Sequence, residues 1–250
     1  ISIQKKEFEK NDKLGLVYAG FYIRNDEGVD SEKDTIIPKK GYLRELVEDN
    51  TYKFETDENN EFKFIVISDT RIGSKSQQLS ILNDIYRKAQ EQGIPNVILC
   101  GNISAGLKPM TDTESNFIDD TRTQIDYIVA NYPKYEGITT YFISGKLDDK
   151  HIAVNRINMG KRIAAARPDM VYLGEDICDV SIDRVKMQVM NSNLSKTYTA
   201  SYRTQQTLDA YRSEDKPDIL LYGGLLQMEK YSYRDVECIS VPSVCATDNE

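Results

Sequence analysis

Short apolar runs alternate with longer amphipathic stretches from residue 62 onward. Strands are predicted where four consecutive residues are apolar or β-branched, at 64–67, 97–100, 140–143, 170–173 and 219–222. Helices are predicted where apolar residues recur every three or four positions, at 76–92, 118–131, 152–166 and 202–212. A hairpin is expected over 180–190, and a last strand over 236–244 interrupted by Pro242. This order predicts an α/β domain built from layers.

The first 61 residues have a different pattern, with dense charge and no long apolar helix. Residues 14–23 are rich in β-forming residue types, and 41–55 reads as a wing-like hairpin that turns at Asp49-Asn50. Residues 56–61 are polar and predict a linker. We therefore expect an N-terminal β-rich appendage with its linker over 1–61 and a second domain over 62–250.

Composition narrows the possible chemistry. The chain has 250 residues and contains no run of eighteen apolar residues, so no membrane-spanning helix is expected. Its net charge of −8 argues against broad capture of nucleic acid. Cys100, Cys178, Cys238 and Cys245 form no C-x-x-C pair, which predicts buried thiols in a reducing compartment. The single histidine, His151, cannot build a metal site that needs several imidazoles.

Four segments carry motifs at the ends of predicted strands. They read FIVISDTRIG at 64–73, VILCGNISAG at 97–106, YFISGKLD at 141–148 and DILLYGGLL at 218–226. In order and strand context they resemble the D-x-H, G-D-x-x-x-G, G-N-H-D and G-H-x-H motifs of calcineurin-like metallophosphoesterases. The resemblance covers residues 62 to 244. It implies a two-sheet α/β sandwich flanked by helices, with the small N-terminal β-rich appendage attached.

The resemblance also points to a metal centre, because that family clamps a phosphoryl group with two cations about 3.5 to 4 Å apart. The positions of that centre correspond here to Asp69, Arg71, Asn102, Lys146, Leu147, Asp148, Asn191, Gly224 and Leu226. Among the metal ligands only Asp69 is kept. Arg71 and Lys146 carry positive charge and have no lone pair to donate. We therefore expect a degenerate site with no metal and no cofactor.

Two interpretations of Arg71 and Lys146 stay open. In one, they pair with Asp69 and Asp148 and keep the loop ends charge-balanced without metal. In the other, Arg71 and Lys146, together with Lys75, form an anion-binding pocket for phosphate or a nucleotide. His151, near the start of a predicted helix, is expected to be a surface or capping residue rather than a general base.

These patterns favour a catalytically inactive pseudo-phosphoesterase that serves as a binding or structural subunit, for which a phage assembly is one setting. One alternative is an atypical metal-dependent phosphoesterase or nuclease that uses Asp69, Asn102, Asp148 and His151 around one ion. Another is a DNA-binding regulator acting through the N-terminal segment. The expected partner is a protein or a second copy of the chain, with no membrane and little support for nucleic acid. The expected location is the cytoplasm or a phage particle.

Overall fold

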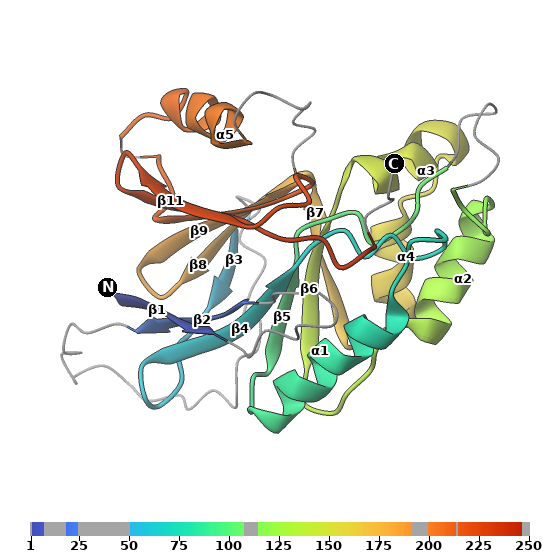
Figure 1. Cartoon of the computed structure of the whole chain (residues 1–250), viewed down its shortest axis with the longest axis horizontal. Helices are drawn as coiled ribbons and strands as arrows, with labels where there is room; N and C mark the ends of the chain where they lie inside the picture. The colour runs from blue at the N-terminus through green and yellow to red at the C-terminus, as the bar shows by residue number, and fades with distance from the viewer. Residues whose placement is uncertain are drawn as a thin grey trace.

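The computed structural model describes residues 2–7, 19–24, 51–107, 115–191, 200–213 and 215–246. Two six-stranded sheets face each other in this part of the chain, in the orders β1-β2-β4-β5-β6-β7 and β11-β12-β10-β9-β8-β3. Helices α1, α2 and α4 lie outside the first sheet, and α5 lies outside the second (Figure 1). The predicted two-sheet α/β sandwich flanked by helices is confirmed.

The first sheet is parallel from β4 to β7 and antiparallel from β1 to β4. Its strands are β1 (Ser2–Glu7), β2 (Ala19–Arg24), β4 (Glu61–Ile67), β5 (Asn96–Leu99), β6 (Thr139–Ser144) and β7 (Met170–Glu175). The helices between its parallel strands are α1 (Leu79–Glu91), α2 (Thr121–Asn131), α3 (Lys146–Asn155) and α4 (Met159–Ala166). This alternation is why the apolar runs of the sequence are spaced by amphipathic stretches.

The second sheet is mixed. Its strands are β3 (Thr51–Phe54), β8 (Ile177–Ile182), β9 (Val185–Asn191), β10 (Ile219–Gly223), β11 (Glu229–Tyr233) and β12 (Val236–Ser240), with α5 (Ala200–Asp209) between β9 and β10. The hairpin predicted over 180–190 is confirmed as β8 and β9, which pair antiparallel. Strand β10 lies between β9 and β12 and is parallel to both.

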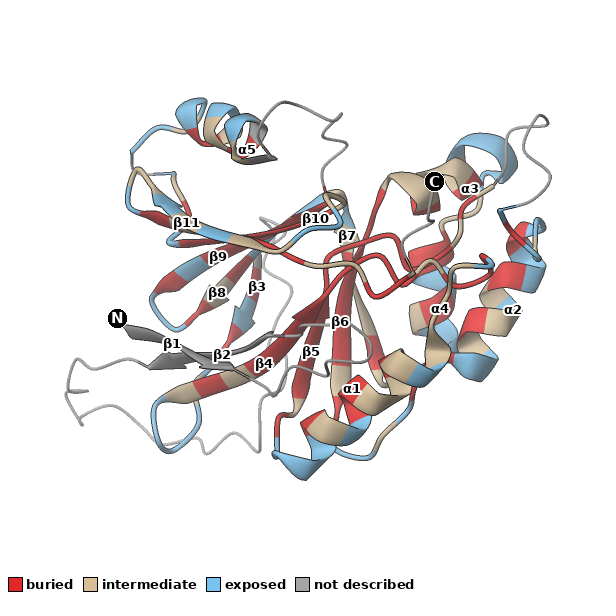
Figure 2. Cartoon of the chain, viewed as in Figure 1, coloured by how far each residue is buried: buried red, intermediate tan, exposed pale blue. Residues whose placement is uncertain are grey.

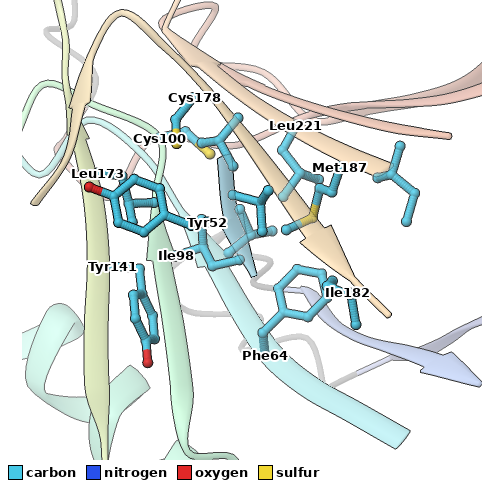
Figure 3. Close-up of a cluster of buried hydrophobic side chains, with 14 of the residues drawn as sticks. Tyr52, Phe64, Ile98, Cys100, Tyr141, Leu173, Cys178, Ile182, Met187 and Leu221 are labelled. Carbon is cyan, nitrogen blue, oxygen red and sulfur yellow. The ribbon is translucent and has the colours of Figure 1, made fainter. Parts of the chain in front are cut away.

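Apolar side chains from both sheets fill the space between them (Figure 3). Phe64 and Tyr141 come from the first sheet, and Ile182, Met187 and Leu221 come from the second. A second core lies between the first sheet and helices α1, α2 and α4, and a third lies under α5. Figure 2 shows that the central strands are buried while the helices keep an exposed outer side. The four cysteines are free and buried, as predicted.

Several predicted boundaries were wrong. The single helix expected at 152–166 is two helices, because Arg156 is left-handed at φ 57° and Asn158 caps α4 by accepting a hydrogen bond from Lys161 N. The last strand ends at Ser240, ahead of Pro242, which has no N–H to donate to a neighbouring strand. Strand β11 had not been predicted. None of the helices in the described ranges is long and apolar enough to cross a membrane.

The described strands of the first 61 residues lie in the two sheets. Strand β2 pairs antiparallel with β4, and β3 pairs parallel with β8. Of the predicted hairpin 41–55, residues 41–50 lie outside the described residues. The predicted linker forms a turn between β3 and β4, in which Asp57 Oδ1 accepts hydrogen bonds from the backbone N–H groups of Asn59 and Glu61. This turn carries the chain from one sheet to the other.

Candidate functional site

The strand ends that carry the motifs meet at one edge of the sandwich. Parallel strands β4, β5 and β6 end at the same edge, as parallel strands must. The ends of β9 and β10 lie against them, because Asn191 Nδ2 donates to Cys100 O at 2.6 Å and a Cβ at Gly223 would lie 2.2 Å from the same oxygen. The loops bend sharply here, with left-handed φ values at Asp69, Arg71 and Asn102.

Asp69 is the centre of this arrangement, and its side chain is fully buried. Oδ1 accepts hydrogen bonds from Arg71 Nη2 at 3.3 Å and from Asn102 Nδ2 at 2.9 Å. Oδ2 accepts from Ser68 Oγ at 2.7 Å and from Gly224 N at 3.0 Å. A carboxylate has about four lone-pair sites, so these four donors saturate it.

The backbone of Asp69 attaches the C-terminal segment to the same point. Its carbonyl oxygen accepts from Cys245 N at 3.0 Å and from Ser243 Oγ at 3.3 Å. Val244 N also donates to Ser68 O at 2.9 Å. Residues 241–246 therefore run along the loop that follows β4 and join it to the end of β10, where Val241 N donates to Tyr222 O at 2.9 Å.

Asn102 and Asn191 fill the space beside Asp69. Asn102 Oδ1 accepts from Leu147 N at 3.0 Å, so both ends of the Asn102 amide have partners. A Cβ added at Gly145 would lie 2.5 Å from Asn102 Oδ1 and 2.6 Å from Asn191 Oδ1. A Cβ at Gly101 would lie 2.7 Å from Asn191 Cβ. Glycine is therefore required at 101 and 145 because the two amides pack directly on the backbone.

Asp148 is a second buried carboxylate, at the start of α3. Oδ1 accepts from Ser104 N at 2.9 Å and Ser104 Oγ at 2.6 Å, and Oδ2 accepts from Gly145 N at 2.9 Å and Ile103 N at 3.2 Å. Burial raises the pKa of Asp148 to about 6, and the hydrogen bonds from Ser104 and the three backbone groups limit the rise. Asp148 thus fastens the helix to the loop after β5.

The expected pairing of cations with these carboxylates is half right. Arg71 pairs with Asp69, but Lys146 pairs with Asp149 and Asp176 instead of Asp148. The reason is that Asp148 turns inward to accept the N–H groups around the helix start, whereas Lys146, at the first position of α3, is 41% exposed at its side chain. The hydrogen bond from Lys146 to Asp176 raises the pKa of Lys146. Arg71 and Lys146, two of the three cations proposed for an anion pocket, therefore already have carboxylate partners.

His151 is buried at 0% exposure, so the expectation of a surface or capping residue was wrong. Its Nδ1 lies 2.8 Å from Thr121 Oγ1 and its Nε2 lies 3.2 Å from Ser104 Oγ. Burial lowers the pKa of His151 to about 4. Because α3 begins six residues earlier than predicted, residue 151 falls one turn after Asp148 on the same inward side.

The remaining positions that correspond to the family's metal centre are a glycine and two leucines, which have no polar side chain. Gly224 contributes its N–H to Asp69, whereas Leu147 is half-buried and Leu226 is exposed with a left-handed φ of 62°. Sequence reasoning missed Ser68 and Ser104, whose hydroxyls bond to Asp69 and Asp148. Their adjacency to the motif residues in sequence is the signal that could have found them.

These residues do not fit a pair of divalent cations. The lone pairs of Asp69 and the amide oxygen of Asn102 are bound to hydrogen-bond donors, and the Arg71 guanidinium lies 3.3 Å from the carboxylate. A cation placed there would need to displace those donors and approach a positive group. Across the described ranges, no group of three His, Cys, Asp or Glu side chains lies close enough together to hold a metal ion.

Neither a scan against protein-family models nor a search of curated proteins gives a match. A search of solved structures does give matches. An archaeal phosphodiesterase is 13% identical, with 72% of this chain and 83% of that chain covered and a TM-score of 0.43. A nuclease of Pseudomonas putida is 10% identical, with 72% and 74% covered and a TM-score of 0.39. Zinc-complexed Vps29 of Entamoeba histolytica is 14% identical, with 72% and 73% covered and a TM-score of 0.37.

The first two neighbours are a phosphodiesterase and a nuclease, and all three TM-scores are below 0.5. No function for this chain follows from that likeness.

Proposed function

We propose that this chain is a non-catalytic protein on a phosphoesterase-like fold and acts as a binding or structural subunit. The observation that carries the proposal is the saturation of Asp69. A phosphoesterase centre needs carboxylate oxygens that are free to bind metal or to accept a proton from water. Here both oxygens are used to hold Ser68, Arg71, Asn102 and Gly224 in place. The loop ends are built as a packed junction rather than as an open site.

The alternative, an atypical site with one ion shared by Asp69, Asn102, Asp148 and His151, has less support. The donors that surround Asp148 come from Ile103, Ser104 and Gly145, and both of its oxygens are occupied. The His151 ring is turned toward α2 and Ser104. No oxygen of either carboxylate is left to face an ion held in common.

The proposed partner is a protein, either another chain or a second copy of this one, in the cytoplasm or in a phage particle. Several large apolar side chains are available for contact on the described surface. They are Phe117, Val154, Ile177, Tyr202 and Leu226. Sedimentation velocity over a concentration series separates the two cases, because self-association raises the mass above the 28.6 kDa of one chain.

Hydrolysis of bis(p-nitrophenyl) phosphate with added Mn²⁺ tests the absence of catalysis. We expect the purified chain to turn over no faster than buffer with Mn²⁺, and Asp69→Asn to behave like wild type. Calorimetric titration with Mn²⁺ alone is expected to give no saturable binding. Mn²⁺-dependent turnover by wild type that is lost in Asp69→Asn, while the variant still folds by circular dichroism, would overturn the proposal.

A further inference from the structure

A chain of buried polar side chains links helix α2 to the start of α3. Asn155 Nδ2 donates to Thr121 Oγ1 at 2.7 Å, and Thr121 Oγ1 lies 2.8 Å from His151 Nδ1. His151 Nε2 lies 3.2 Å from Ser104 Oγ, which donates to Asp148 Oδ1 at 2.6 Å. Thr121, His151, Ser104 and Asp148 are each at most 2% exposed. The four side chains therefore interact with one another and not with bulk water.

The positions of the hydrogens follow from donor and acceptor counts. The Ser104 hydrogen is committed to Asp148, so its contact with His151 requires a hydrogen on Nε2. A neutral imidazole carries only one ring hydrogen, so Nδ1 is an acceptor and Thr121 must donate to it. At neutral pH all bonds consequently run one way, from Asn155 through Thr121, His151 and Ser104 to the Asp148 carboxylate.

The same atoms support the opposite direction once Asp148 carries a proton. Protonated Asp148 donates to Ser104 Oγ, and Ser104 then donates to His151 Nε2. The ring hydrogen then lies on Nδ1, which donates it to Thr121 Oγ1. The two lone pairs of Thr121 Oγ1 accept this hydrogen and one from Asn155 Nδ2, and the hydroxyl hydrogen of Thr121 turns away from the ring. One proton has been added, the ring is still neutral, and the charge of the network changes from −1 to 0.

We propose that Thr121, His151, Ser104 and Asp148 form a two-state hydrogen-bond relay whose direction reverses when Asp148 takes up a proton, with His151 passing from its Nε2–H to its Nδ1–H tautomer. The relay is a pH-sensitive element built into the corner where α2, α3 and the loop after β5 meet. It is independent of the proposed function, since it involves neither catalysis nor a partner.

The charged surroundings agree with this order of events. Burial raises the pKa of Asp148 to about 6 and lowers that of His151 to about 4, so the carboxylate protonates first as pH falls. Asp120 at the cap of α2 and Lys150 of α3 act on the ring in opposite directions. The Asp148 charge also acts on Tyr172 of β7, and burial together with Glu175 and Asp148 raises the pKa of Tyr172, so it stays neutral in this range.

Nitrogen-15 NMR of the imidazole tests the relay directly, because His151 is the only histidine in the 250 residues. With ¹⁵N-histidine labelling of the full chain, we expect the Nε2–H tautomer at pH 8 and the Nδ1–H tautomer at pH 5.2, with a midpoint near pH 6. Ser104→Ala, which cuts the link to Asp148, is expected to abolish this step. Ser240→Ala, a buried serine on β12 that bonds to Gln227 O, is the matched control and should keep it.

Three results would overturn the relay. They are a ring that becomes doubly protonated with an ordinary midpoint near pH 6.5, a ring that keeps one tautomer throughout, and a Ser104→Ala protein that still switches. Thr121→Val provides a second variant in case Ser104→Ala does not fold. It removes the acceptor for Nδ1–H, so the step should move to lower pH or disappear.

Discussion

Replacing Asp69 with alanine removes the acceptor around which the loops are arranged. Four donors lose the carboxylate, although Ser68 Oγ keeps Cys100 O as an acceptor at 3.1 Å. The Asn102 amide is buried, and the Arg71 side chain keeps 27% of its surface in contact with water. A buried donor without a partner costs about 1 to 3 kcal/mol. Breaking a buried ion pair costs about 3 to 5 kcal/mol, and less where water reaches the cation that is left. We therefore expect Asp69→Ala to lower the free energy of unfolding by about 4 kcal/mol.

Urea-induced unfolding measures this loss, followed by far-ultraviolet circular dichroism and by tyrosine fluorescence, since the chain has sixteen tyrosines and no tryptophan. Asp84→Ala is the matched control, because Asp84 pairs with Arg87 and Lys88 on the exposed side of α1. Such a surface pair contributes about 0.2 to 1 kcal/mol. The reasoning is refuted if Asp69→Ala loses less than about 1 kcal/mol, or no more than Asp84→Ala.

Two further predictions follow from the same edge of the sandwich. Burial raises the pKa of Asp148 to about 6, so protonated Asp148 stabilises the fold fully below pH 3.8, and this stabilisation is lost as pH rises through 6. Burial lowers the pKa of His151 to about 4, so neutral His151 stabilises the fold above pH 6.5, and this stabilisation is lost as pH falls through 4. The two contributions offset each other in wild type, so in His151→Gln the free energy of unfolding, measured by urea titrations at several pH values, should rise by about 2 kcal/mol from pH 6.5 to pH 4. A profile as flat as that of wild type would count against this. Gly145→Ala should cost about 2 kcal/mol or more by the same assay, because its Cβ would meet Asn102 Oδ1 at 2.5 Å. Gly93→Ala, whose Cβ meets nothing, should cost only the left-handed penalty of roughly 1 kcal/mol, and equal losses would contradict the crowding at Gly145.

The layered fold could be predicted from the sequence because its strands are buried on both faces. Runs such as 64–67 and 97–100 lie between a second sheet on one side and helices on the other, so every position is apolar. Strand β11 lacks that signal, because it is at the edge of its sheet and alternates half-buried with exposed residues. The break at Arg156 was missed for a different reason, since an arginine in the left-handed region carries none of the usual signature of a helix end.

The sequence could predict where the candidate site lies but not all of the contacts within it. The motifs put Asp69, Asn102 and Asp148 at the ends of neighbouring strands, and the structure brings them to one edge. The sequence could not show that Lys146 turns away from Asp148, because that choice depends on the rotamers at a helix start. Nor could it show that His151 is buried, since that depends on where α3 begins.

The two buried carboxylates illustrate two ways to keep a negative charge inside a protein. Asp69 has the Arg71 guanidinium within 3.3 Å, so a positive group compensates its charge. The groups that bond to Asp148 are all neutral, so its burial is relieved by a proton instead, and its pKa rises. The edge of the sandwich therefore has an ion pair at the ends of β4 and β10 and a carboxylate with a raised pKa between α2 and α3. A change of pH near 6 should therefore act on the Asp148 carboxylate and the hydrogen bonds that it accepts.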